Sequence, residues 1–380
     1  MIKVNGGEKS GSGTILRCAV SLSTLLGEDL FIHNIRARRK KTGLRAQHLK
    51  GVLACSEICG GRVENAEVGS HQILYKPGKQ VRGGYYEWDI GTAGSTTMLA
   101  ATVLPAACFA TRPMRFRIKG GLFQDYAPSA YHMQHVLFPL LREMGVEAHL
   151  KIIRPGYVPR GGGVIEVRVE PIAGRIRPLN FLYPGNIRQI KGIAISSHLE
   201  QRRVSERMVK KCEAVLKVDG YDAQIKEIYD TTSIQEGAAL ALFSRSDTGC
   251  IIGSDRAGKP GRSSEEIGRF VAKKWLQDIQ TGATVDRYLA DQLIIYAALA
   301  EGNTEYHIPR MTEHVDTNLW LVNRILGAKT TLKDNHLKIE GIGFKFRAAS
   351  KCSVNPVSLQ GTKSLRGGAE ANSELPRLSL

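Results

Sequence analysis

Apolar residues recur at helical spacing after glycine-rich turns at three places in the chain. The first pattern follows Gly11-Ser12-Gly13 and predicts an amphipathic helix over residues 14–26, which Gly27 ends. Alternating and apolar runs after this helix predict further elements in a fixed order. These are a strand over 30–35, a helix over 46–59 that stops at Gly60-Gly61, and strands near 62–68 and 72–75.

The same order of elements returns twice more. The second copy begins at Gly94-Ser95 and the third at Gly282. The second copy has predicted helices over 96–109 and 130–144 and strands over 114–118, 149–153 and 164–169; the third has helices over 285–300 and 315–326, a strand over 305–308 and further strands up to 339. Similar spans between matching features favour a true repeat over a coincidence of loop lengths.

A block of about a hundred residues separates the second copy from the third. It has its own helix patterns over 204–218 and 264–280 and strand patterns over 189–195, 238–243 and 250–252. We therefore predict an α/β (α+β) fold in which three repeated units form a main domain that carries a smaller inserted α/β domain. The predicted boundaries are 1–183 and 282–343 for the main domain, 184–281 for the insertion, and 344–380 for a disordered tail without apolar periodicity.

The composition of the chain also indicates a class of binding partner. Hydrophobic residues make up 42% and charged residues 23% of the 380 residues, as in ordinary globular proteins, whereas 53 Lys and Arg against 36 Asp and Glu leave a formal net charge of +17. Such an excess favours a polyanionic partner. No stretch reaches about 18 consecutive apolar residues, so nucleic acid is a better candidate than a membrane, and we expect a soluble chain.

The cysteines and the amino terminus bear on location. The seven cysteines are odd in number, contain no C-x-x-C pair and mostly have apolar neighbours, which favours buried thiols over a disulfide or zinc framework. Residues 1–8 contain no apolar stretch of the length that a secretion signal needs. We expect the protein in the cytoplasm, and the sequence does not indicate its oligomeric state.

Residues 253–260 (Gly-Ser-Asp-Arg-Ala-Gly-Lys-Pro) nearly match the spacing of a Walker A loop. That loop needs a hydroxyl group for the metal and a backbone N–H after the lysine to hold phosphate, and Pro260 supplies neither. The segment is better interpreted as a surface turn.

Residues 36–50 form the most basic segment, and they include no acidic residue. Arg38, Arg39 and Lys41 belong to this segment, which we call the basic loop, and it leads into the helix that Gln47 and His48 begin. Because backbone N–H groups at a helix start also attract anions, we favour a phosphate-binding role over a merely solvated loop. Gln47 and His48 can add directional hydrogen bonds to ribose or phosphate.

His314 is the first candidate for covalent chemistry. It opens the helix after Thr312, so its imidazole should lie near the positive end of the helix dipole. That position disfavours the imidazolium and keeps a neutral, nucleophilic ring near pH 7. The alternative is an ordinary structural histidine. Residues 288–292 and the glycine run 161–163 are weaker signals, compatible with core packing and a close backbone approach.

Several motifs together resemble the conserved blocks of RNA 3′-terminal phosphate cyclases, in order and in spacing over about residues 1–343. These blocks are Gly11-Ser12-Gly13-Thr14-Ile15-Leu16-Arg17, Gly43-Leu44-Arg45-Ala46-Gln47-His48-Leu49, Gly91-Thr92-Ala93-Gly94-Ser95, Pro159-Arg160-Gly161-Gly162-Gly163, Tyr288-Leu289-Ala290-Asp291-Gln292-Leu293 and Thr312-Glu313-His314-Val315-Asp316-Thr317-Asn318. The resemblance implies the same three-unit fold with an insertion.

The resemblance also implies a reaction, the ATP-dependent conversion of an RNA 3′-phosphate into a 2′,3′-cyclic phosphodiester. His314 matches the histidine that attacks the α-phosphate of ATP to give covalent histidine-AMP, from which the adenylyl group passes to the RNA phosphate. The family uses a divalent metal, Mg or Mn. Tyr288, Asp291, Gln292 and Pro128 match positions around the nucleotide, and Arg17, Arg39 and Gln47 match positions near the phosphates and the RNA end, to which the basic loop adds Arg38 and Lys41.

Two departures from the family pattern concern the site. Ser10 stands where a metal-associated glutamate is usual, and Glu8 is the nearest acidic residue that can replace it as a metal ligand. Ala101 replaces a glutamine that is usual near the nucleotide. The alternative function is a non-catalytic scaffold, similar to the cyclase-like proteins of ribosome assembly, which bind RNA or protein. Those relatives lack the nucleophilic histidine, so His314 favours the enzyme.

Overall fold

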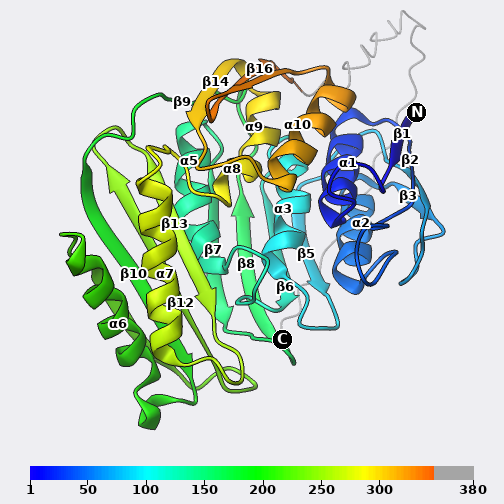
Figure 1. The fold of residues 1–380 in the computed structure, drawn as a ribbon. Coiled ribbons are helices and arrows are strands. Elements are labelled where there is room, and N and C mark those ends of the chain that lie inside the picture. Colours follow the sequence, from blue (N-terminus) through cyan, green and yellow to red (C-terminus); the bar gives the residue numbers. More distant parts are fainter. Residues whose placement is uncertain (346–380) are drawn as a thin grey trace, which may run out of the picture. The chain divides into compact units, whose positions relative to one another are not determined.

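The computed structural model describes residues 1–345, and within them the strands form four sheets of four strands each. Three of these sheets share one connectivity (Figure 1). In each, the first strand pairs in parallel with the second, the second pairs antiparallel with the fourth, and the fourth pairs antiparallel with the third. In sheet order the strands are β1 (Ile2–Asn5), β2 (Leu30–His33), β4 (Ile73–Lys76) and β3 (Arg62–Glu64); β5 (Gly84–Asp89), β6 (Met114–Gly120), β8 (Gly163–Val169) and β7 (Ala148–Arg154); and β9 (Asn180–Phe181), β14 (Glu301–His307), β16 (His336–Ile342) and β15 (Lys329–Lys333).

Each of these sheets has two helical segments between its strands, so the predicted threefold repeat and the α/β fold class are confirmed. Each unit also gains a first strand, namely β1, β5 or β9, that the hydrophobic pattern did not predict. The helices are α1 (Gly13–Leu26) and α2 (Ala46–Cys59) in the first unit; α3 (Thr96–Ala107) and the consecutive α4 (Ala130–His132), η1 (Met133–Leu137) and α5 (Phe138–Glu143) in the second; and α8 (Leu289–Gln292), α9 (Ile294–Leu299) and α10 (Glu313–Leu326) in the third.

The insertion interrupts the third unit instead of separating two complete units. β9 pairs with β14 through Asn180 and Phe181, although β9 lies before the inserted segment and β14 after it. The inserted sheet has the order β11-β10-β12-β13, and α6 and α7 lie side by side on it (Figure 1). Its elements are β10 (Ile187–Ser197), η2 (Glu200–Arg202), α6 (Val204–Val218), β11 (Gln224–Asp230), β12 (Gly237–Ser246), β13 (Ile251–Ala257) and α7 (Ser264–Ile279).

The inserted segment buries a hydrophobic cluster of its own between the helices and the sheet, which includes Met208, Leu240 and Trp275. The larger cluster runs through all three repeated units. Residues 1–345 nevertheless lie within one compact unit. The domain boundaries at residues 184 and 281 stay a prediction.

Two predicted helices differ from the observed ones. The helix expected over 285–300 begins only at Leu289, because Val285 forms a bridge with Ile251 and the buried Asp286 carboxylate accepts hydrogen bonds from the backbone N–H groups of Tyr288 and Leu289. The helix expected over 130–144 is interrupted by the π-helical turn η1. The first change lies within the third unit, and the turn η1 of the second change contacts α8 of that unit.

The near-Walker segment is not a surface turn over its whole length, and that interpretation was wrong for residues 253–257. They continue the largely buried strand β13, and only the residues after Ala257 leave the sheet. Residues 258–263 do connect β13 to the start of α7, but the first glycine of the motif, Gly253, lies within the strand and Pro260 has no N–H, so the geometry agrees with the exclusion of a Walker A site.

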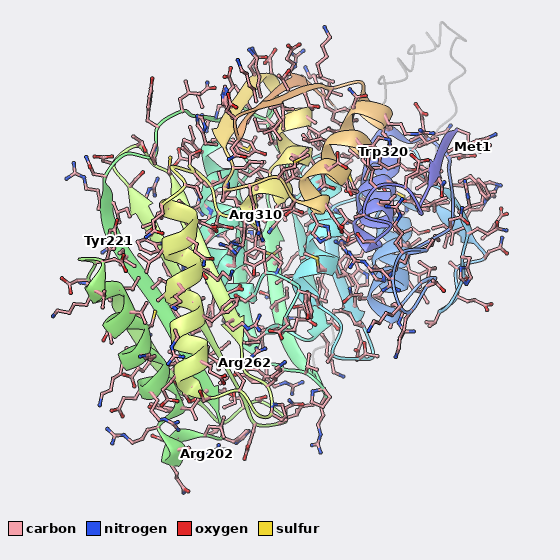
Figure 2. The ribbon with its side chains drawn as sticks, viewed as in Figure 1. Met1, Arg202, Tyr221, Arg262, Arg310 and Trp320 are labelled. Carbon is pink, nitrogen blue, oxygen red and sulfur yellow. The ribbon has the colours of Figure 1, made fainter. Side chains whose placement is uncertain are left out.

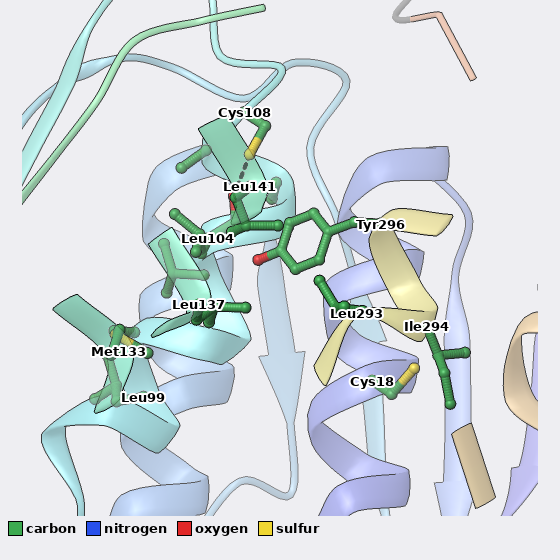
Figure 3. Packing of buried hydrophobic residues seen from close by; sticks show 14 of the residues in the cluster. Cys18, Leu99, Leu104, Cys108, Met133, Leu137, Leu141, Leu293, Ile294 and Tyr296 are labelled. Carbon is green, nitrogen blue, oxygen red and sulfur yellow. Dashed lines mark hydrogen bonds between the residues drawn. The ribbon is translucent and has the colours of Figure 1, made fainter. Parts of the chain in front are cut away.

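The main core lies among the helices of the three units. Figure 3 shows the Tyr296 ring of α9 among residues of other units, such as Leu104 and Leu141, with Cys18 of α1 nearby. The six cysteines within the described residues are buried and free, as predicted, and Cys352 lies outside them. Phe344 packs edge-on against Phe109 at a centroid distance of 5.0 Å, so the predicted tail does not begin at 344. Its remaining residues, 346–380, lie outside the described part.

Candidate active site

His314 is the second residue of α10, which begins because Thr312 caps it. Thr312 has an extended backbone, and its hydroxyl accepts a hydrogen bond from the N–H of Val315 at 3.1 Å. The first N–H groups of a helix form the positive end of its dipole, so a positive charge on the His314 ring is disfavoured there. The His314 side chain is exposed, as a nucleophile must be.

The ring of His314 is held by a residue from the opposite end of the chain. Its Nδ1 lies 3.1 Å from the hydroxyl oxygen of Thr14, 300 positions away in sequence. The same hydroxyl accepts a hydrogen bond from Nη2 of Arg17 at 3.0 Å. Partial burial lowers the pKa of His314, and the positive charges of Arg17 and Arg39 lower it further. The imidazole is therefore neutral at pH 7.

The start of α1 meets the start of α10 at this point. Ser12 caps α1, and the ring of His48 occupies the space beside Gly13, where a Cβ atom would collide with it. The loop before α1 is attached to the first turns of α10 by two contacts. Lys9 Nζ lies 3.2 Å from Asp316, and the N–H of Ser10 donates to the Thr317 hydroxyl at 3.2 Å. Two helix N-termini thus converge, an arrangement that attracts anions.

A small cavity of about 70 Å³ lies beside this junction, between α1, α3, α8 and α10. Arg17 and Asp291 face it, without forming a direct ion pair within residues 1–345. Burial lowers the pKa of Arg17 to about 10, so its guanidinium remains charged at pH 7. Burial also raises the pKa of Asp291 to about 7, although the Arg17 charge opposes the shift. The cavity is therefore positive near neutral pH.

Two polar atoms at this cavity have no protein partner within the described residues, namely Oε1 of Gln292 and Oδ1 of Asn318. Their amide nitrogens do have partners. Gln292 Nε2 donates to the Tyr288 carbonyl at 3.1 Å, and Asn318 Nδ2 donates to the Asp291 carbonyl at 2.9 Å. Because buried polar atoms are normally paired, the two oxygens are available to accept hydrogen bonds from water or from a bound ligand.

Pro128 and Tyr288 are the other two predicted nucleotide positions, and they precede α4 and α8 respectively. The Pro128 carbonyl accepts a hydrogen bond from the Thr97 hydroxyl at the start of α3, at 2.8 Å. Tyr288 precedes α8 and packs edge-on against the ring of His132 at a centroid distance of 5.7 Å. Asp291 follows Tyr288 by three positions, so the aromatic residue and the cavity residue belong to one short segment.

Only some of the cations of the basic loop act at the site. Arg39 is close enough to His314 to lower the pKa of its ring, whereas Arg38 uses its guanidinium to bind the Lys9 carbonyl at 2.6 Å. The side chain of Lys41 is exposed. Gln47 Oε1 accepts a hydrogen bond from the N–H of Ser95 at 2.9 Å, which joins the starts of α2 and α3.

Two residues of this site were missing from the sequence prediction, Thr14 and Asn318. Each lies one turn of helix from a predicted residue, since Thr14 precedes Arg17 by three positions and Asn318 follows His314 by four. Side chains at these spacings lie on one face of a helix. That spacing was the available signal, but it does not reveal that Thr14 contacts a helix far away in the sequence.

Comparisons with known proteins show the family to which the chain belongs. The family model for RNA 3′-terminal phosphate cyclase matches residues 8–332. The chain belongs to this family of enzymes. Among curated relatives, the RNA 3′-terminal phosphate cyclase of Methanopyrus kandleri is 34% identical over 88% of this chain and 95% of its own length, and that of Pyrococcus furiosus is 36% identical over 86% and 94%. The relative from Pyrobaculum neutrophilum is 33% identical over 90% and 99%.

The two departures from the cyclase family pattern occupy clear places in the structure. Ser10 is buried, and its hydroxyl lies 2.9 Å from that of Ser12, so this position faces into the loop. Glu8 is half-buried at the start of the loop. Ala101 lines the cavity next to Met98, where its small side chain leaves room.

Neither a preformed metal-binding cluster nor a membrane-spanning helix is found within residues 1–345. No group of three or more His, Cys, Asp or Glu side chains in this part of the chain is arranged to hold a metal ion. None of the helices in the same residues is both long enough and apolar enough to cross a membrane.

Proposed function

We propose that this chain uses ATP to convert the 3′-phosphate end of an RNA into a 2′,3′-cyclic phosphodiester, through a covalent adenylate on His314. The observation that carries the proposal is the state of His314: a neutral, exposed imidazole at the junction of two helix N-termini, with Nδ1 held by Thr14. Nε2 has no protein partner within residues 1–345 and can act as the nucleophile.

The reaction has three displacement steps. In the first, the lone pair of His314 Nε2 forms a bond to the α-phosphorus of ATP, and the bond to the bridging oxygen breaks so that pyrophosphate leaves. In the second, an oxygen of the RNA 3′-phosphate attacks the same phosphorus, and the imidazole leaves with the electron pair of the P–N bond. In the third, the neighbouring 2′-OH attacks the RNA phosphorus, loses its proton and expels AMP.

Thr14 is the hydrogen-bond partner that can hold the tautomer the first step requires. Arg17 donates to one lone pair of the Thr14 hydroxyl, which leaves a second lone pair and the O–H proton available to His314 Nδ1. The proposed reaction uses the arrangement in which the N–H of Nδ1 donates to that second lone pair. With the proton on Nδ1, the lone pair lies on Nε2. Thr14 is therefore a positioning residue that acts through His314.

The surrounding residues divide between the nucleotide and the RNA. Tyr288 and Pro128 supply apolar surface for the adenine, and Asp291 and Gln292 supply polar atoms for the nucleotide. Phosphate charge is met by helix N-termini and by cations. Arg17, Arg38, Arg39, Lys41 and Gln47 are the residues proposed for the phosphates and the RNA end.

A divalent metal, Mg or Mn, would neutralise charge that develops on the phosphates during transfer. Mg²⁺ is commonly held by one or two carboxylates, substrate phosphates and water, so a site with a single protein carboxylate is sufficient. Glu8 fits this requirement, since it is half-buried on the loop that docks beside His314 and forms no ion pair within residues 1–345. The buried Ser10 does not supply a carboxylate.

The test is covalent labelling. Incubation with α-labelled ATP and Mg²⁺ or Mn²⁺ should leave acid-labile, base-stable label on the wild-type chain and none on His314→Ala. A Glu8→Gln variant should need more metal for the same labelling. A wild-type chain that takes up no label under any metal would contradict the proposal and leave the scaffold function.

A separate measurement tests the RNA end. Arg39→Ala with Lys41→Ala removes two cations of the basic loop and spares Arg38, which holds the loop by its bond to Lys9. We expect weaker binding of an RNA with a 3′-phosphate and a flatter dependence on salt. Unchanged binding and salt slope would remove the basic loop from the site.

A further inference from the structure

The inserted segment carries a basic groove of about 500 Å³ that the proposed reaction does not use. We call it the α7 groove. Its cations are Arg256, Lys259, Arg262, Arg269, Lys273 and Lys274. Glu266 is the acidic residue among the lining side chains, and it is already committed, since its carboxylate accepts a hydrogen bond from the N–H of Ser263 in the capping box of α7.

The α7 groove follows one face of the helix. Arg269, Lys273 and Gln277 lie on successive turns of this face, about 6 Å apart along the axis, while Val271 and Trp275 are buried on the other side. The cations thus form a row along the helix, which differs from the compact pocket that a helix start provides for one phosphate group.

Most of this charge has no counter-ion. Arg256 and Arg262 both pair with Asp125, at 3.3 and 2.9 Å. Lys259, Arg269, Lys273 and Lys274 form no ion pair within residues 1–345. The pKa of Lys274 is lowered by burial and then by Arg287 and Arg310, which shows how closely the cations are gathered.

The neighbouring helix α6 shows that this is not the general character of the inserted surface. Three cations at its start are paired, Arg203 and Lys210 with Glu206, and Arg207 with Glu265, whereas Lys211 and Lys217 form no ion pair within residues 1–345. A helix face that served only for solubility would mix both signs in the same way. The α7 groove concentrates one sign, as surfaces that bind polyanions do.

The groove also offers an aromatic side chain. The Arg256 guanidinium lies 4.2 Å from the centroid of the Phe270 ring, and Lys274 Nζ lies 5.6 Å from it. Proteins that bind single-stranded nucleic acid commonly combine a positive groove with aromatic or guanidinium planes on which bases stack.

Interactions at both ends of α7 involve chain segments that continue into the candidate active site. Asp125, the partner of Arg262, precedes Pro128 by three residues, and the charge of Arg256 acts on Tyr288. At the other end of α7, Arg310 acts on Lys274 and precedes His314 by four residues. Figure 2 shows Arg262 by the start of α7 and Arg310 towards its other end. A strand whose terminus reaches His314 can therefore continue into the groove.

We infer that the α7 groove binds the phosphodiester backbone of the RNA strand on the 5′ side of the end being processed. The identity of the polyanion rests on the proposed function, whereas the binding surface does not. The inserted segment then acts as a second RNA-binding surface that favours long substrates over short ones.

The test compares two variants that lose the same charge. The groove variant is Lys259→Ala, Arg269→Ala and Lys273→Ala, three exposed positions. The control is Arg202→Ala, Lys217→Ala and Lys226→Ala, three exposed cations elsewhere on the inserted segment. Binding of a single-stranded 20-nucleotide RNA with a 3′-phosphate is measured from 50 to 200 mM salt, alongside a 3′-phosphorylated dinucleotide.

The groove variant should bind the long RNA about tenfold more weakly at 50 mM salt, and its plot of log K against log salt should be flatter by about two, since each lost contact contributes about 0.7. The dinucleotide and the control variant should behave as the wild type. Equal losses in the control and groove variants would overturn the inference, and so would an unchanged affinity for the long RNA.

Labelling of His314 by ATP in the absence of RNA separates this inference from the proposed function. Labelling should be the same in the groove variant and the wild type. A groove variant that labels poorly, with normal RNA binding, would assign the groove to the triphosphate and overturn the inference. A wild-type chain without label, but with groove-dependent RNA binding, would defeat the proposed reaction and support the groove.

Discussion

His314 and His132 occupy opposite environments in the same molecule. His314 stands exposed at the start of α10, with a hydroxyl as the partner of Nδ1. His132 is buried at the end of α4, with Nε2 3.1 Å from the buried carboxylate of Asp286. Burial alone would lower the pKa of His132, but the charge and hydrogen bond of Asp286 outweigh it and raise that pKa. The surroundings favour the neutral form of the first ring and the protonated form of the second.

The comparison shows what a nucleophilic histidine needs besides its residue type. It needs a neutral ring, a partner that accepts the proton of one nitrogen, and access for the substrate to the other nitrogen. His132 has such a partner in Asp286, but the carboxylate favours the protonated ring and the core encloses the other nitrogen, so no substrate reaches it. In this molecule the histidine paired with a carboxylate, His132, has a structural role, and the histidine paired with a hydroxyl, His314, is suited to act as a nucleophile.

The largest expected effect is the loss of activity when the nucleophile His314 is replaced. His314→Ala should abolish labelling by ATP and reduce cyclisation on the order of a thousandfold or more, since nothing replaces the attacking nitrogen. The unfolding temperature should stay within about two degrees of the wild type, because the side chain is exposed. A labelled His314→Ala chain would show that another residue accepts the adenylyl group.

The second-largest expected effect is a loss of stability when the buried His132 is replaced. His132→Ala leaves the Asp286 carboxylate buried without its counter-ion, and it should lower the free energy of unfolding by about 3–5 kcal/mol. Urea denaturation followed by circular dichroism measures this loss. His149→Ala is the matched control, because the ring of His149 is exposed and its loss should change stability by less than about 0.5 kcal/mol.

The pH dependence of that loss follows from the signs of the two shifts. The pKa of His132 is raised above 6.5, so its contribution is complete below pH 6.5 and is lost as pH rises through the folded value. The pKa of Asp286 is lowered below 3.8, so its contribution is complete above pH 3.8 and is lost as pH falls through the folded value. The cost of His132→Ala should be largest between these limits, and a constant cost up to pH 9 would contradict the ion pair.

The sequence predicted the repeated helices well because their ends carry local signals. Gly27, Gly60 and Gly327 each adopt a positive φ and end α1, α2 and α10, as a C-terminal glycine does. The first strands β1, β5 and β9 were missed for a physical reason. Each lies at one edge of its sheet. β1 and β9 have only four and two residues, and β5 alternates between exposed and partly buried positions, so none carries a run of apolar residues.

The site was less accessible to prediction than the fold. The resemblance named His314, Arg17 and Asp291, and the helix patterns indicated their elements, but the Thr14–His314 contact joins two helix starts through tertiary packing. The α7 groove was missed because its cations alternate with buried residues along α7. Only the folded helix places them in one row.

The third-largest expected effect comes from replacing Thr14, the hydrogen-bond partner of His314. Thr14→Val removes the hydroxyl that holds Nδ1 and should slow labelling about tenfold, which corresponds to one lost hydrogen bond. Thr14→Ser keeps the hydroxyl and should restore most of the rate. ¹⁵N NMR of the imidazole should show the Nδ1–H tautomer in the wild type and a mixture in Thr14→Val. A purely structural Thr14 would affect the unfolding temperature and leave the tautomer unchanged.

The smallest effect concerns the charge around His314. Since the pKa of that ring is lowered, labelling should rise with pH and reach half its maximum below pH 6.5 in the wild type. Arg39→Ala removes one of the cations that lower this pKa, so the midpoint should move up, while the rate above pH 7 changes by no more than about twofold because an exposed charge acts weakly. Arg62→Ala, an exposed arginine on β3, should leave the midpoint in place. A midpoint that ignored Arg39 would mean that burial and the helix terminus alone keep the His314 ring neutral.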